Sequence, residues 1–157
     1  MKLKIKVKYR NADTKRLSIN PLGDWIDLYS DDDVYTTKGS VGMLNLGVAM
    51  KLPNGFEAVA LPRSSTFKSF KITQTNSQGV IDQPYCGDDD YWKYPYMAWE
   101  NTTIERGDKI CQFRIQLSQK ANIWQKLKWL FSSGVELVEV EKLSKENRGG
   151  FGTTGKK

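Results

Sequence analysis

An all-β domain, built as a barrel or as two packed sheets, is the fold that the sequence predicts. The chain contains many short segments of strand-like composition, and residues typical of turns separate them. Only one stretch has a clear helical period. Its 157 residues suit a single domain, and its content of 39% apolar and 27% charged residues is ordinary for a soluble globular protein.

The first expected element is a strand over residues 3–9. Lysines at 2, 4, 6 and 8 alternate with apolar residues, which is the period of a strand with one wet face. A row of lysines also discourages pairing with other chains. The net charge of +6 is compatible with an anionic partner, but this alternation favours a solvated strand face over a nucleic-acid surface.

Further strands are expected at 25–29, 41–52, 56–61, 110–117 and 135–140, with extended backbone at 79–81. The turn sequence Pro53-Asn54-Gly55 separates two of them, and Asp31-Asp32-Asp33 reads as a loop. Residues 66–70 are expected to form a helical turn. The polar and aromatic segment 88–101 is expected to be irregular, because Pro95 lies inside it.

A short amphipathic helix is expected within residues 121–131. Ile123, Leu127, Leu130 and Phe131 follow one another at the spacing of one helix face. Such a helix can pack on the surface of its own domain, or it can bind a membrane surface or a protein partner.

The composition excludes several kinds of chemistry. The sequence contains no histidine, so no Ser-His-Asp triad, histidine base or histidine-bound metal can form. Cys86 and Cys111 are its only cysteines and form no CxxC pair, so no structural zinc site is expected. Reduced thiols, the lack of a long apolar run and an N-terminus unlike a signal peptide indicate a soluble cytoplasmic protein.

The glycine-rich segment 144–157 is expected to be a flexible arm outside a domain of residues 1–143. Its backbone N–H groups, hydroxyls, guanidinium and aromatic ring suit a nucleotide phosphate and base. The residues concerned are Arg148, Phe151, Gly152, Thr153 and Thr154. The alternative is a plain linker, and the spacing is not that of a P-loop.

Three further segments can carry chemistry, and each has a plainer interpretation. Arg63-Ser64-Ser65 can bind an anion or can cap a helix. Asp82, directly after an apolar strand end, can be held as a general base or can close its own turn. Gln112 is polar within an apolar strand and needs a partner if it faces inward.

In their order along the chain, these segments resemble the five motifs of the homotrimeric dUTPase family, the deoxyuridine triphosphate nucleotidohydrolases. The third and fifth motifs are the most specific. The matching segments are Asp27-Leu28-Tyr29-Ser30, Arg63-Ser64-Ser65, Gly79-Val80-Ile81-Asp82 with Tyr85, Gly107 to Gln112, and Gly149 to Gly155.

The resemblance implies a jelly-roll-like or distorted β-barrel subunit, assembled as a homotrimer, that hydrolyses dUTP with Mg²⁺. Asp82 would activate the water that attacks the α-phosphorus, and Tyr85 would exclude a ribose 2′-hydroxyl. The backbone of Gly79, Val80 and Ile81 would bind uracil, and Phe151 would cover it. Asp27 would hold a water of the Mg²⁺. The implied phosphate ligands are Arg63, Ser64, Ser65, Gln112, Thr153 and Thr154, with Gly152 in the same arm.

The sequence departs from the family pattern at several places. Cys86 stands where the family commonly has Arg, and Arg148 precedes Phe151 by only three residues, which bears on its role as a phosphate ligand. Two other functions stay open: a related dCTP deaminase, or a nucleotide-gated regulator that binds a protein through 88–101 or 121–131. Ammonia release from dCTP would identify the first.

Overall fold

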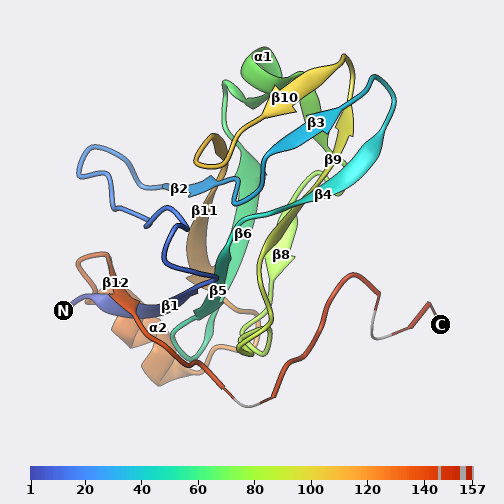
Figure 1. Ribbon diagram of the computed structural model, residues 1–157. Helices are drawn as coiled ribbons and strands as arrows, with labels where there is room; N and C mark the ends of the chain where they lie inside the picture. Colours follow the sequence, from blue (N-terminus) through green and yellow to red (C-terminus); the bar gives the residue numbers. More distant parts are fainter. Residues whose placement is uncertain (145, 153–154, 157) are drawn as a thin grey trace.

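The computed structural model describes residues 1–144, 146–152 and 155–156 (Figure 1). Most of its regular structure is β-strand, as predicted. The strands are β1 (Leu3–Tyr9), β2 (Ile26–Tyr29), β3 (Val34–Thr36), β4 (Val41–Asn45), β5 (Val48–Lys51), β6 (Phe56–Pro62), β7 (Ile72–Gln74), β8 (Gly79–Ile81), β9 (Lys93–Ala98), β10 (Thr102–Ile104), β11 (Lys109–Leu117) and β12 (Val135–Glu139). The helices are α1 (Thr66–Phe70) and α2 (Ile123–Leu130).

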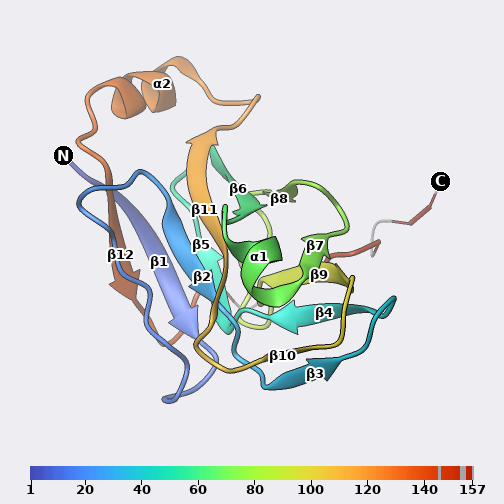
Figure 2. The ribbon, with the colours of Figure 1, turned by 90° about the horizontal axis from the view of Figure 1, so that it is seen from above.

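A sheet of four strands in the order β2-β11-β6-β8 carries five of the predicted site residues: Asp27, Gly79, Val80, Ile81 and Gln112. Three smaller sheets surround it, in the orders β12-β1-β5, β4-β9-β7 and β10-β3 (Figure 2). The described strands therefore form a jelly-roll-like arrangement of sheets and do not close into one barrel.

The core lies between these sheets and explains the alternation in the sequence. In β1, Leu3, Ile5 and Val7 are fully buried while Lys4 and Lys6 are exposed, which confirms the predicted wet face. Phe113 of β11 is also fully buried and packs edge-on against Trp92, with ring centroids 5.1 Å apart. This contact fixes β11 against the loop that leads into β9.

The prediction for 88–101 is wrong, because the segment contains β9, the central strand of its sheet. Pro95 lacks an N–H, but its carbonyl accepts a hydrogen bond from Thr75 N, just past the end of β7. The N–H that Pro95 lacks would therefore have pointed to a residue past the end of the neighbouring strand. Its absence removes no hydrogen bond between the two strands. The predicted strand at 41–52 is likewise divided, into β4 and β5, because Gly47 turns the chain with φ of 69°.

Both segments that were expected to be helical are helical in the described part of the chain. The helical turn at 66–70 is confirmed as α1, and the helix at 121–131 is confirmed as α2. Asn122 and Gln125 form a capping box at the start of α2. Within the described residues, no helix is long and apolar enough to cross a membrane.

Candidate active site

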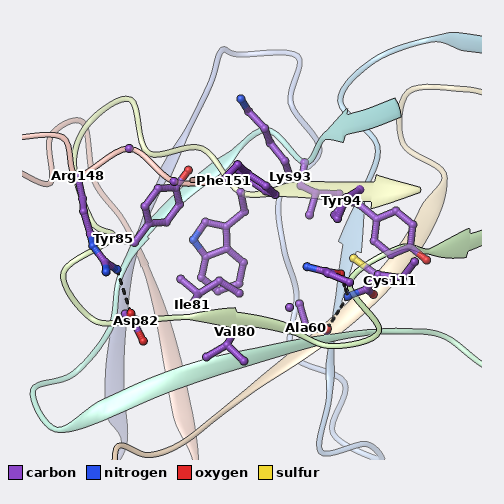
Figure 3. Close-up of a pocket in the computed structure, with 18 of the residues that line it drawn as sticks. Ala60, Val80, Ile81, Asp82, Tyr85, Lys93, Tyr94, Cys111, Arg148 and Phe151 are labelled. Carbon is purple, nitrogen blue, oxygen red and sulfur yellow. Dashed lines mark hydrogen bonds and ion pairs between the residues drawn. The ribbon is translucent and has the colours of Figure 1, made fainter. Parts of the chain in front are cut away.

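A cavity of about 300 Å³ lies between the strand β8 and the C-terminal arm (Figure 3). Gly79, Val80 and Ile81 form one wall because β8 pairs antiparallel with β6 at the edge of the central sheet. An edge strand pairs with a neighbour along only one of its two edges, so the backbone N–H and C=O groups on the other edge of β8 can bind a ligand. The third predicted motif thus forms a pocket wall.

Asp82 lies at the mouth of this cavity, where β8 ends. Its backbone carbonyl accepts the Tyr85 N–H at 3.0 Å and so closes the turn. Its carboxylate instead pairs with Arg148, with 3.0 Å between Oδ2 and Nη1. The Asp82 side chain is 51% accessible, because the turn carries it out of the sheet. The side chain is thus available to a substrate and is not consumed by the turn.

Tyr85 is half-buried beside Asp82. Its hydroxyl donates to the carbonyl of Tyr91 at 3.0 Å, which fixes the ring. Burial, and then the charge of Asp90, raise the pKa of Tyr85 above its usual value, so the phenol stays neutral and is no base at neutral pH. A rigid, neutral ring suits a steric role against a sugar.

The arm crosses the open side of the cavity. Phe151 and Gly152 line it, and Phe151 remains 57% exposed. Gly149 and Gly152 have φ of 72° and 98°, a left-handed conformation that favours glycine, so they can turn the chain over the pocket. Thr153 and Thr154, predicted to bind phosphate, lie outside the described residues.

A second group of polar side chains lies at the opposite edge of the central sheet, around Asp27 in β2. Its two carboxylate oxygens pair with Arg63 Nε and Lys109 Nζ, each at 3.0 Å. Gln112 faces Asp27 across the ladder and donates to the Pro62 carbonyl at 3.3 Å. The first, second and fourth predicted motifs therefore meet in one place, which we call the Asp27 cluster: Asp27, Arg63, Lys109 and Gln112.

The two serines of the second motif lie beside this cluster. Arg63 Nη1 donates to Ser65 Oγ at 3.4 Å, and Ser64 is exposed. Ser65 occupies the N-cap of α1 but makes no capping bond with its side chain, so its hydroxyl is not used for a cap. The serines thus keep their capacity for an anion.

The sequence analysis missed two residues that build the Asp27 cluster. Lys109 lies within the fourth motif but was given no role. Thr66 is buried, and its hydroxyl accepts from Arg63 N at 2.8 Å and donates to Ile110 O at 2.7 Å. It therefore ties the Arg63 backbone to β11. Only the fold reveals this bridge, because the two segments are 44 residues apart.

The Asp27 cluster and Asp82 do not meet within one chain. The strand pairings place the backbone of Asp82 about four residues along the strand direction and three strand spacings across the sheet from the backbone of Asp27. At ordinary strand dimensions this is roughly 19 Å. One triphosphate bound near Asp82 cannot also reach the Asp27 cluster of the same chain.

The buried cysteine beside the cavity, Cys111, is not suited to act as a nucleophile. Both cysteines are free, and Cys111 is fully buried against the cavity. Burial strongly raises the pKa of the Cys111 thiol, followed by the nearby charge of Asp27. A protonated, buried thiol is a poor nucleophile, so no nucleophilic role is expected for Cys111.

A divalent cation would find few protein ligands here. Among the described residues, no group of three acidic or cysteine side chains could hold a metal ion. Asp27 is a single carboxylate that already faces two cations. Mg²⁺ therefore fits this site only with a ligand that brings most of the oxygens, such as a triphosphate.

The comparisons with known proteins agree on one family. The dUTPase family model matches residues 25–155. Over 155 residues the chain is 44% identical to an SPbeta prophage-derived deoxyuridine 5′-triphosphate nucleotidohydrolase of Bacillus subtilis, covering 99% of this chain and all of that protein. It is 31% identical to the deoxyuridine 5′-triphosphate nucleotidohydrolase of Finegoldia magna, with 99% of both chains covered.

Solved structures show the same fold. A mutant dUTPase from phage phi11 of S. aureus, which coordinates a structural Mg(II) ion, matches with a TM-score of 0.66 and 15% identity over 76% of this chain and 94% of its own. The dUTPase of Streptococcus mutans matches with a TM-score of 0.64 and 16% identity over 74% and 98% of the two chains.

Proposed function

Because this chain belongs to the dUTPase family, we propose that it hydrolyses dUTP to dUMP and pyrophosphate, with Asp82 as the general base. The observation that carries the assignment is the place of Asp82: an accessible carboxylate at the mouth of a cavity whose wall is the backbone of β8. A carboxylate there can take a proton from a water next to the α-phosphorus of a nucleotide whose base enters the cavity.

The other residues of the cavity position the substrate. The free backbone groups of Gly79, Val80 and Ile81 pair with the uracil edge, and the Tyr85 ring leaves no room for a 2′-hydroxyl. Phe151 covers the base and excludes water, while Thr153 and Thr154 bind the outer phosphates. Phosphoryl transfer depends on such positioning and on charge neutralisation more than on covalent chemistry.

Arg148 has two partners in this account. Without nucleotide it pairs with Asp82. The more strongly charged triphosphate then attracts the guanidinium, whose planar fork suits phosphate oxygens, and Asp82 becomes free to act as base. Asp27 would hold a water of a bound Mg²⁺, which would supply positive charge to neutralise the triphosphate. Arg63, Ser64, Ser65 and Gln112 bind phosphate oxygens beside it.

The separation of Asp27 from Asp82 requires a second copy of the chain. We place the Asp27 cluster of one copy against the cavity of its neighbour in a homotrimer, so that each site combines residues of different copies. Asp82→Asn and Arg63→Ala would then each be inactive alone but complement one another. An equal mixture, unfolded and refolded together, should recover about a quarter of wild-type activity, because each site draws the two residues independently.

This recovery is measured as dUTP turnover after co-refolding. The two variants refolded separately and then combined are the control, and they should stay inactive. If co-refolding restores nothing although both variants fold and assemble, the site is not shared between copies.

Substrate selectivity tests the assignment itself. We expect pyrophosphate release from dUTP with Mg²⁺, and much slower release from UTP, dTTP and dCTP. The reason is that the cavity binds uracil selectively and excludes a sugar that carries a 2′-hydroxyl. Comparable rates with UTP would reject the role of Tyr85, and ammonia release from dCTP would favour the deaminase. No Glu is among the described residues that line the cavity, which supports the hydrolase.

We also propose that this protein is a cytoplasmic enzyme and that it binds a regulatory protein partner. The dUTPase of Staphylococcus bacteriophage 80alpha is described as controlling the transfer of virulence genes by a G protein-like mechanism. In this chain, α2 exposes Ile123, Trp124, Leu130 and the adjacent Phe131, each at least 62% accessible. This exposed apolar surface favours α2 as the site that binds the partner. Residues 88–101 are less suited, because they are mostly built into the sheet around β9.

A further inference from the structure

The chain from Gly87 to Asp90 contacts the arm before the arm reaches the cavity. Asp90 is buried, and its carboxylate accepts three backbone N–H groups: Gly87 at 2.8 Å, Arg148 at 2.9 Å and Gly149 at 3.0 Å. Two of the three donors belong to the arm. A buried carboxylate needs such partners, so without the arm Asp90 would lose most of its compensation.

The two neighbouring carboxylates contact the arm as well. Asp88 accepts the Leu143 N–H at 2.7 Å. This bond, helped by Lys8 and Lys142, holds the pKa of Asp88 below its usual range. Asp89 and Asn147 bond reciprocally: Asp89 N donates to Asn147 Oδ1 at 2.8 Å, and Asn147 Nδ2 donates to Asp89 Oδ2 at 3.0 Å. Asp89 and Asp90 thus hold the arm itself, and Asp88 holds Leu143, the residue just before it.

Gly87 provides independent evidence of a fitted contact. A Cβ on Gly87 would collide with Asn147 and would lie 2.5 Å from the Glu146 carbonyl oxygen. Its φ is not in the left-handed region, and the three atoms nearest to such a Cβ all belong to the arm. The arm therefore passes directly over the Gly87 backbone.

We infer that Gly87, Asp88, Asp89 and Asp90 form a dock that positions the arm for closure over the uracil cavity. The inference rests on the proposed role of the arm. The dock fixes the backbone of Arg148 and Gly149, so that the Arg148 side chain reaches Asp82 and Phe151 reaches the cavity. These four residues are positioning residues: they touch the arm, while the arm touches the substrate.

The dock gives a physical reason for the short spacing between Arg148 and Phe151. With Gly149 fixed by Asp90 and turned by its positive φ, only Gly150 separates the fixed point from Phe151. Gly150 itself passes close to Tyr85, since a Cβ on it would lie 3.3 Å from the ring. The arm is thereby held at both Asp90 and Tyr85 before Phe151 enters the site.

Two variants test the dock from different sides. Asp90→Asn removes the charge and turns one acceptor into a donor, and Gly87→Ala blocks the path of the arm. Because one hydrogen bond to a charged group corresponds to a factor of about ten to a hundred, we expect kcat/KM for dUTP to fall by at least about tenfold in each variant. Gly23→Ala, in an exposed loop where the new Cβ meets only the flexible Asn20 side chain, is the control.

The decisive comparison uses a chain that lacks residues 147–157. In that background Asp90→Asn and Gly87→Ala should change kcat/KM no further, because the arm they position is gone. If they lower it as much as in the full chain, they act on the core and the dock is rejected.

Asp89 and Asn147 allow a rescue experiment. Asn147→Asp places two carboxylates together and should lower kcat/KM, whereas Asp89→Asn alone should change little, since its amide can still accept from Asn147. The double variant Asp89→Asn/Asn147→Asp restores a donor opposite an acceptor and should recover activity. An absence of recovery would contradict this pairing.

Proteolysis tests the dock without catalysis. Trypsin should cleave after Arg148 faster in Asp90→Asn and Gly87→Ala than in the wild type or Gly23→Ala. Equal cleavage rates would overturn the dock even if dUTP turnover were as proposed. Faster cleavage in a protein that did not hydrolyse dUTP would retain the dock and reject only the proposed function.

Discussion

Replacing Asp82 by Asn is expected to lower kcat for dUTP by about 10²–10⁴-fold, the range for loss of a general base. The amide keeps the size of the side chain but cannot take a proton from water. Nucleotide binding should be retained or strengthened, because Arg148 loses its partner at 3.0 Å and is freed for the phosphates. Steady-state turnover and titration with a non-hydrolysable dUTP analogue measure the two effects separately.

Asp13→Asn is a suitable control for this variant, since Asp13 is an exposed carboxylate that does not line the cavity. It should leave both quantities unchanged. Full activity in Asp82→Asn would show that another group activates the water.

Removing residues 147–157 is expected to have a comparable effect. The deletion removes the Phe151 ring, worth about 1–3 kcal/mol as a stacking partner, and the charged bonds of Arg148, worth about 1.5–3 kcal/mol each. Together these correspond to a loss of about 10²–10⁴-fold in kcat/KM. The fold should persist, because the buried core residues all precede this segment.

Circular dichroism and thermal unfolding check the fold of the shortened chain, and pyrophosphate release checks its activity. A chain that lacks only residues 156–157 is the matched control and should behave like the wild type. Unchanged turnover in the longer deletion would remove the arm from the mechanism.

The sequence predicts those parts of the fold in which local pattern and burial coincide. The alternation in β1 and β11 follows directly from one buried face, and the period of residues 121–131 identifies α2. Strand β9 was not predicted, because a proline such as Pro95 is typical of segments that are not strands. The Pro95 carbonyl accepts a hydrogen bond from Thr75, which lies past the end of β7. This position follows from the order of the strands in the sheet, which a local sequence pattern does not contain.

The same limit applies to the candidate site. Motif order predicts roles for Asp82 and Arg63, since their chemistry is carried by single residues in characteristic surroundings. The dock was missed, because Asp88-Asp89-Asp90 resembles any solvated acidic run until the arm, 58 residues later, is seen to contact it. The family resemblance implies a homotrimer, and the ladder positions of Asp27 and Asp82, which only the fold supplies, support our proposal that different copies contribute them to one site.

A crystal structure with a non-hydrolysable dUTP analogue and Mg²⁺ tests the central claim most directly. We expect uracil against β8, Arg148 turned from Asp82 to the phosphates, and one ordered water within hydrogen-bond distance of Asp82 and in line with the α-phosphorus. An Asp82 still paired with Arg148, with no water between it and that phosphorus, would contradict the mechanism.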